Sequence, residues 1–148
     1  MDNWTPEQAA QELLAVLPLL TRLVAAEVRR EAGDETTMPQ FRVLTHLAEG
    51  PLTVSGLARR RRVSLQAMGE LVQVLVARGW VERAPDPNDR RQQLLILTEQ
   101  GRLHYESMQM HVMAQIVPLL ARLDADEMAA VQVALPALHR VFAGDDNV

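Results

Sequence analysis

The sequence predicts a mainly α-helical fold of the α+β class, and three observations support this. Start signals for helices recur along the chain, and glycines stand where helices are expected to end. Residues 80–84 and 92–98 bracket a loop rich in Pro, Asn and Asp, which indicates a β-hairpin. Long apolar stripes at helical spacing occupy both ends of the chain. The expected architecture is a central module with one hairpin, flanked by terminal helices.

The helix boundaries follow from capping signals. Capping boxes are predicted at Thr5, Thr37 and Asp124, because a Gln or Glu follows each of them three residues later. Glycines at positions 33, 50, 79 and 144 suit the left-handed end of a helix. Together these signals predict helices at 6–32, 38–49, 54–61, 65–78, 99–122 and 125–142, and strands at 80–84 and 92–98.

The terminal stripes predict a homodimer. Leu13, Leu17 and Leu20 belong to the N-terminal stripe, and Leu135 and Phe142 belong to the C-terminal one. A small central module cannot cover both stripes, so we expect them to bury each other and their copies in a second subunit. The expected domains are a helical dimerisation region (6–32 and 103–143), a central module (38–102) and a flexible tail (144–148).

Composition excludes several classes of function. The chain has no cysteine, which removes disulfides, thiol catalysis and thiolate metal sites. Pro18 and Arg22 interrupt the most apolar segment, and no signal-peptide pattern precedes it, so we expect a cytoplasmic protein without a membrane span. No nucleophile elbow, phosphate-binding loop or zinc-protease motif is present. The sequence therefore predicts neither an enzyme nor a cofactor.

Charge is distributed unevenly along the chain. The formal net charge is −4, and every basic side chain other than histidine is arginine. Residues 53–102 nevertheless hold nine Arg against five acidic residues, a local charge of +4, while the rest of the chain carries −8. A positive segment within an acidic protein favours double-stranded DNA as a partner of that segment.

The helix predicted at 65–78 has one apolar face and one small or polar face. This is the pattern of the second helix of a helix-turn-helix, whose N-terminal part enters the major groove. Ser64 is placed to cap it and to contact a phosphate, and Gln66 and Gln73 offer the donor and acceptor pair that adenine presents. Ala67 and Gly69 allow close approach, and Glu70 is also directed outward. The alternative is an ordinary amphipathic core helix.

A β-hairpin that follows a helix-turn-helix pattern is typical of a winged helix-turn-helix. The tip of the predicted hairpin carries Asp89, Arg90 and Arg91. An arginine at a hairpin tip can enter the minor groove, and Asp89 is spaced to hold the Arg91 side chain extended. The alternative is a solvated turn with an incidental ion pair, which would contribute less than about 1 kcal/mol.

Residues 38–102 resemble the DNA-binding module of the MarR family of transcriptional regulators. The stretches that carry the resemblance are Leu57-Ala58, Val63-Ser64, residues 78–83, residues 87–91 with their Asp-x-Arg, and residues 97–101. The resemblance implies a triangular homodimer that binds a pseudo-palindromic operator, usually as a repressor. It also implies a response to small aromatic or phenolic effectors.

The four arginines at 59–62 depart from that family pattern, which has Leu and Gly at the last two positions. Successive helical residues sweep through roughly 300° over four positions, so the four cannot share one solvent face. Arg61 is expected to point partly inward. Arg62 falls at a turn where Gly would be left-handed, so either it accepts a strain of about 1–2 kcal/mol or the turn is rearranged. The cluster, including Arg59 and Arg60, forms either an added phosphate clamp or a solvated helix end.

An effector site is indicated only by residue type and spacing. Arg42 and His46 share the outer face of the second helix, where they can meet a carboxylate, and His104 and Met108 can add to the lining from the fifth. The alternative is surface or packing positions for all four. His104 and His111 do not predict a metal site, because no His-x-x-x-His pair and no thiolate ligand accompanies them. The competing function is a winged-helix dimer that binds a protein instead of DNA.

Overall fold

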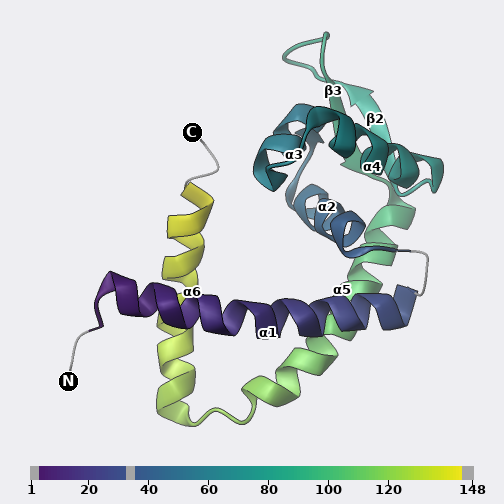
Figure 1. Cartoon of the computed structure of the whole chain (residues 1–148). Coiled ribbons are helices and arrows are strands. Elements are labelled where there is room, and N and C mark those ends of the chain that lie inside the picture. Colours follow the sequence, from purple (N-terminus) through teal and green to yellow (C-terminus); the bar gives the residue numbers. More distant parts are fainter. Residues whose placement is uncertain (1–3, 33–35, 145–148) are drawn as a thin grey trace.

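The computed structural model describes residues 4–32 and 36–144 (Figure 1). It is mainly helical with one small antiparallel sheet, which confirms the predicted fold class. The elements in chain order are α1 (Pro6–Ala32), α2 (Met38–Glu49), β1 (Leu52–Thr53), α3 (Val54–Arg61), α4 (Leu65–Ala77), β2 (Val81–Pro85), β3 (Gln93–Leu97), α5 (Glu99–Leu120) and α6 (Ala125–Gly144).

The predicted boundaries agree with these elements to within two residues, and the reason is local hydrogen bonding. All three capping boxes form: at Thr37, for example, the backbone N–H donates to Gln40 Oε1 at 3.0 Å, and the Gln40 N–H donates to Thr37 Oγ1 at 3.4 Å. Helix α6 continues to Gly144, the first residue of the expected tail. The helix stop at Gly33 and tail residues 145–148 lie outside the described residues.

The sheet has the order β1-β3-β2, and its first strand was not predicted. Strand β1 is two residues long, with Leu52 opposite Leu95 and Thr53 opposite Leu94. So short a segment carries no periodicity, and only its partner strand identifies it. One face of the sheet packs against the helices of the module, and the fully buried side chains include Leu44, Leu57, Val72, Leu75 and Leu95.

The turn between α3 and α4 depends on Arg62. This residue has φ 50° and ψ 45°, which is the left-handed conformation, so of the two alternatives the strained turn is the one that forms. The Arg62 N–H donates to the Arg59 carbonyl, and the Val63 N–H donates to the Ala58 carbonyl, each at 3.1 Å. These bonds satisfy two of the last four carbonyls of α3 and set the direction in which α4 leaves.

The base of the hairpin is fixed at Trp80. Its ring is buried and stacks on the His104 ring of α5, with 3.9 Å between centroids and 14° between planes. A Cβ added at Gly101 would overlap the backbone carbonyl of Trp80. Glycine at position 101 therefore lets the first turn of α5 lie directly against the start of the hairpin.

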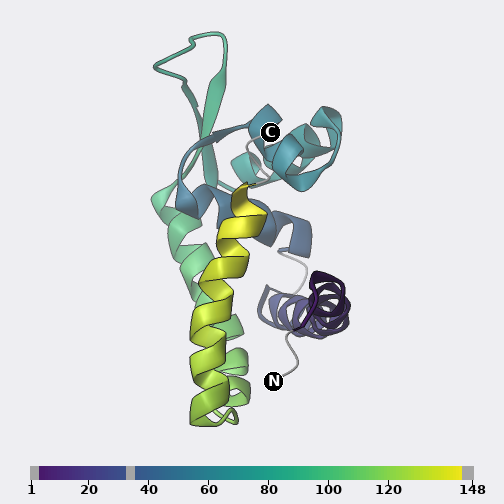
Figure 2. The ribbon, with the colours of Figure 1, turned by 90° about the vertical axis from the view of Figure 1, so that its left-hand side faces the viewer.

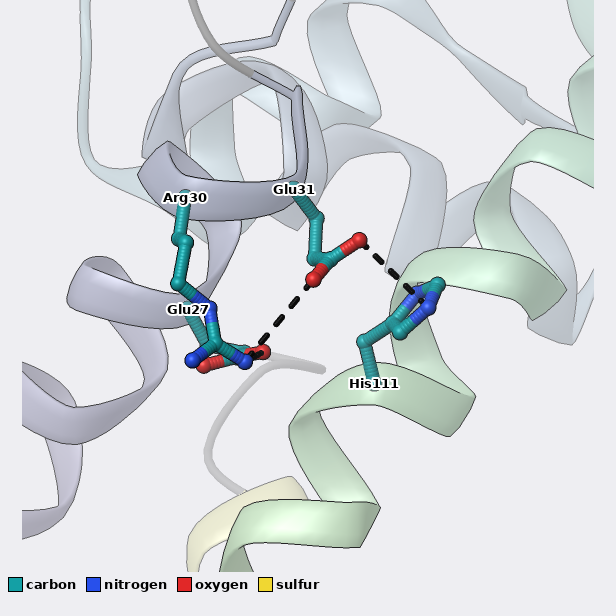
Figure 3. A network of polar contacts seen from close by, with 4 residues as sticks. All are labelled: Glu27, Arg30, Glu31 and His111. Atoms are coloured by element: carbon teal, nitrogen blue, oxygen red, sulfur yellow. Dashed lines mark hydrogen bonds and ion pairs between the residues drawn. The ribbon is translucent and has the colours of Figure 1, made fainter.

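The terminal helices lie outside this module. The C-terminal part of α1 packs on α5, where Glu31 Oε2 lies 3.4 Å from His111 Nε2 and buried Glu27 pairs with Arg30 at 2.6 Å (Figure 3). Figures 1 and 2 together show α6 standing apart from α1. None of the residues of α6 is buried. We had expected the two apolar stripes to bury each other in part within one chain. They do not, because α6 has no buried residue.

Helix α1 also has the length and apolar composition of a membrane-spanning helix over Pro6–Glu31, and the most apolar window of that segment is fully unburied. Pro18 and Arg22 do not prevent this, contrary to the sequence-based expectation. Length and composition alone do not distinguish such a span from a helix that is covered by another subunit.

The left-handed conformation of Arg62 predicts that Arg62→Gly stabilises the fold. Glycine adopts this conformation without the strain of about 1–2 kcal/mol that a side chain adds, so the free energy of unfolding should rise by about 1 kcal/mol. Urea denaturation at one fixed protein concentration measures it. Arg59→Gly is the matched control, because within helix α3 the same substitution should cost about 1 kcal/mol. Equal losses in both variants would contradict the prediction.

The contact at Gly101 predicts that Gly101→Ala destabilises the protein by about 1–3 kcal/mol, because backbone atoms of Trp80 must move. Gly69→Ala is the control, since a Cβ there meets no atom within 4 Å. In the interior of α4 that change should raise stability by up to about 1 kcal/mol. Thermal unfolding of both variants measures the difference, and an unchanged melting temperature for Gly101→Ala would disprove the contact.

Candidate nucleic-acid interface

Helix α4 is packed on one side and open on the other. Met68, Val72 and Leu75 are buried in the core. Ser64 caps the helix as predicted, because its Oγ accepts the Ala67 N–H at 3.1 Å. Exposed residues on the other side include Gln66, Ala67, Glu70 and Gln73. The inner face packs as that of an amphipathic core helix does. The outer face is polar and exposed, so it is available to a partner.

Polar contacts on this outer face orient both glutamines. Gln66 Nε2 donates to Glu70 Oε1 at 3.4 Å, and Gln73 Oε1 accepts from Arg83 Nη2 at 3.4 Å. Arg83 belongs to β2, so the second contact places the base of the hairpin beside the outer face of α4. The sequence had assigned no role to Arg83, because nothing in the spacing of ten residues indicates that a strand and a helix meet there.

The hairpin extends beyond the rest of the module, as Figures 1 and 2 show. Strands β2 and β3 pair from Val81 opposite Leu97 to Pro85 opposite Gln93. The loop between them is closed by two backbone bonds, from Asp86 N–H to the Gln92 carbonyl at 3.0 Å and from Gln92 N–H to the Asp89 carbonyl at 2.9 Å. This loop is ordered by its own hydrogen bonds and needs no contact with the module.

Asp89 acts differently from the prediction. Its Oδ1 accepts the backbone N–H of Arg91 at 3.0 Å, and the described residues include no ion pair between the two side chains. A short side chain at this position can reach the amide two residues later, which shapes the turn. Arg90 and Arg91 are both exposed at the tip. The carboxylate therefore sets the loop, and the guanidinium groups face solvent.

The arginines at 59–62 separate, as the helical sweep predicted. Arg59 and Arg62 are exposed, whereas Arg60 is half-buried and lies 3.9 Å from Glu49 of α2. Burial lowers the pKa of Arg61, and the nearby charge of Arg42 lowers that pKa further. A clamp made of all four is thus not formed, because two of them face α2.

The structure does not bring the four proposed effector residues into one site. Met108 is buried in the core, and His104 stacks on Trp80 while its Nε2 lies 2.9 Å from Thr36 Oγ1. His46 lines a hollow of about 830 Å³, and Arg42 is not among the residues that line it. Residues missed from the sequence complete this hollow: Glu49 and Arg60 from the module, and Leu135, Pro136, Leu138, His139, Phe142 and Ala143 from α6.

The reason for this division is the orientation of α5. His104 and Met108 are four residues apart and share a face, and that face is directed into the module. Within residues 4–32 and 36–144, no group of three His, Cys, Asp or Glu side chains could hold a metal ion. His111, the second histidine considered for a metal, lies against Glu31.

Comparisons with known proteins agree with this geometry. The model of the MarR family matches residues 36–92, from the start of α2 through the hairpin loop. The multiple antibiotic resistance protein MarR of Escherichia coli is 34% identical over 103 residues, which cover 68% of this chain and 72% of that protein. An HTH-type transcriptional regulator of Mycobacterium bovis is 35% identical, but the chain spans only 64% of its length.

Solved structures extend the likeness to nearly the whole chain. RV1404 from Mycobacterium tuberculosis has a TM-score of 0.80 at 27% identity, with 95% of this chain and 96% of that chain covered. Apo MarR from Escherichia coli has a TM-score of 0.74 at 28% identity, with 93% of this chain and 98% of that chain covered.

A sequence relative also matches nearly the whole chain. The HTH-type transcriptional repressor NicR of Pseudomonas putida is 29% identical over 99% of this chain. The extent of these matches, and the winged module they share, show that this chain belongs to the MarR family.

Proposed function

We propose that the protein is a sequence-specific regulator that binds double-stranded DNA as a homodimer and represses transcription from a pseudo-palindromic operator. The observation that carries this proposal is the outer face of α4, which is polar and exposed beside an extended hairpin with two exposed arginines. This is the arrangement in which a helix enters the major groove and a wing reaches the adjacent minor groove. Two relatives are named as repressors, NicR and MarR.

The distribution of charge supports DNA as the partner. Arg59, Arg62, Arg83, Arg90 and Arg91 are exposed on the module, within the segment whose local charge is positive. Each arginine that neutralises a phosphate releases counterions, and this release gives DNA binding its steep salt dependence. The acidic remainder of the chain lowers non-specific attraction to nucleic acid elsewhere on the surface.

The unpartnered helices support a homodimer. Leu13, Leu17 and Leu20 of α1 are 38–55% exposed, and Leu135 and Phe142 of α6 are 58% and 62% exposed. A second copy that covers these faces would remove a large apolar area from water, and two-fold symmetry would space two recognition helices about one DNA turn apart. We assign the apolar face of α1 to this interface instead of a membrane, and the protein to the cytoplasm, where the DNA is.

An effector site is proposed at the hollow between the module and α6. Arg60 and His46 line one side of it, and Leu135 and Phe142 line the other. Arg60 lies 3.9 Å from Glu49 on the same side, and a ligand carboxylate could replace that partner. The apolar side suits the ring of a small aromatic or phenolic acid. Such a ligand would bridge the module to α6 and so bias the separation of the two recognition helices.

The wing predicts that Arg91→Ala weakens operator binding. Loss of one charge-assisted contact should reduce affinity about tenfold and reduce the slope of log affinity against log salt by about 1. Fluorescence anisotropy across a salt series measures both. Arg122→Ala is the control, because Arg122 is an exposed arginine at the end of α5. Equal effects of the two substitutions would remove the wing from the interface. If the affinity of the wild type for DNA does not depend on salt concentration, the protein-binding alternative is favoured instead.

The exposed stripes predict that Leu17→Glu and Leu135→Glu each shift the protein from dimer to monomer at micromolar concentration. A carboxylate in a desolvated interface costs several kcal/mol when it has no partner. Sedimentation equilibrium measures the mass of each variant. Gln11→Glu, which adds the same charge at an exposed polar position of α1, should leave the dimer intact. A wild-type monomer under these conditions would refute the assignment of both faces.

A further inference from the structure

We propose that Glu70 is the specificity-determining residue of α4 and that it reads cytosine, by accepting a hydrogen bond from the N4 amino group in the major groove. This assignment rests on the proposed function and adds to it the residue and the base. The sequence-based hypothesis had placed that role on Gln66 and Gln73, with adenine as the base.

Helix geometry puts Glu70 at the centre of the outer face. At about 100° per residue, Gln66, Glu70 and Gln73 fall within roughly 60° of one another. The buried residues Met68, Val72 and Leu75 define the opposite direction. Of the three outward residues, Glu70 is the nearest to directly opposite the core, and along the helix axis it lies between the two glutamines. Any base edge that the middle of α4 meets therefore meets a carboxylate.

The contacts of the two glutamines direct one polar group of each toward a protein partner. A carboxylate only accepts, so Gln66 presents one N–H of its NH₂ group to Glu70. A guanidinium only donates, so Gln73 presents one lone pair of its carbonyl oxygen to Arg83. Each amide keeps a donor and an acceptor, but these contacts hold it beside a protein partner, and bidentate recognition of adenine needs the amide to be directed at the base edge. The second oxygen of Glu70 is then the central acceptor of the surface.

Only one base edge suits a lone carboxylate there. Guanine presents the acceptors N7 and O6, thymine presents O4, and adenine presents the acceptor N7 beside its amino group, so each places a lone pair near the negative charge. Cytosine presents its N4 amino donor without an adjacent acceptor. The same charge repels phosphates, so Glu70 lowers affinity for arbitrary sequences while it favours one base.

The test is selection of binding sites from randomised duplex DNA with the full-length wild type, Glu70→Gln and Glu70→Ala. The wild type should enrich cytosine at one position of each half-site, with a preference over the other bases of roughly 5- to 100-fold. Glu70→Ala should lose the preference at that position alone. Glu70→Gln should change it toward adenine, because an amide can donate and accept. Position 70 is exposed, and circular dichroism checks that both variants keep the fold.

A charge control separates base reading from general electrostatics. Glu106→Gln removes the same charge from an exposed position on α5 and should leave the selected sequence and the affinity for random duplex unchanged. Both Glu70 variants should bind random duplex at least as tightly as the wild type does. Specific binding by Glu70→Ala with the wild-type base ranking at every position would overturn the assignment to Glu70 while the proposed function stands. A wild type that selects no sequence would overturn the proposed function and this assignment with it.

Discussion

The packing around Trp80 determines how the recognition helix, the hairpin and α5 are oriented. The indole stacks on His104, and the guanidinium carbon of Arg78 lies 5.1 Å from the ring centroid. The Trp80 carbonyl lies against Gly101 and accepts the Thr98 N–H at 3.1 Å. Arg78 Nη1 is buried without a hydrogen-bond partner, so contact with the ring offsets part of the desolvation of that group. The first turn of α5, the start of the hairpin and the end of α4 therefore meet at one residue.

Affinity and selectivity are assigned to different residues of that surface. In the proposed function, the arginines of the hairpin tip and of the α3 end would attract any duplex, since phosphates carry no sequence information. The outer face of α4 contains two glutamines and one glutamate but no positive charge between Ser64 and Ala77. The helix therefore adds little non-specific attraction, and its donors and acceptors are available for discrimination between bases. Arg83 connects the two regions, because it is a cation of the hairpin that orients a glutamine of α4.

The terminal helices contribute little to the buried core of the chain. Val28 is the residue of α1 that belongs to the buried core, and α6 contributes none. Both helices therefore expose apolar surface at a cost in free energy until a second surface covers them. In the proposed dimer, the free energy of folding would depend on protein concentration, and the hollow beside α6 would take its final shape only in the assembly.

Sequence alone determined the features that depend on neighbours within about four residues. The capping boxes, the ends of the helices and the cap at Ser64 all follow from local backbone chemistry, as does the separation of the arginines around α3. The sequence left two conformations open for Arg62, and the turn in the structure decided between them. Tertiary structure decided that Gln73 meets Arg83, that His104 stacks on Trp80 while His46 faces α6, and that β1 exists at all. Asp89 is an intermediate case: its carboxylate had two local partners, the amide and the side chain of Arg91, and the fold of the loop selected the amide. The physical reason is that a local bond is specified by residues adjacent in the chain, whereas a contact between α4 and β2 exists only after the core has set their relative orientation.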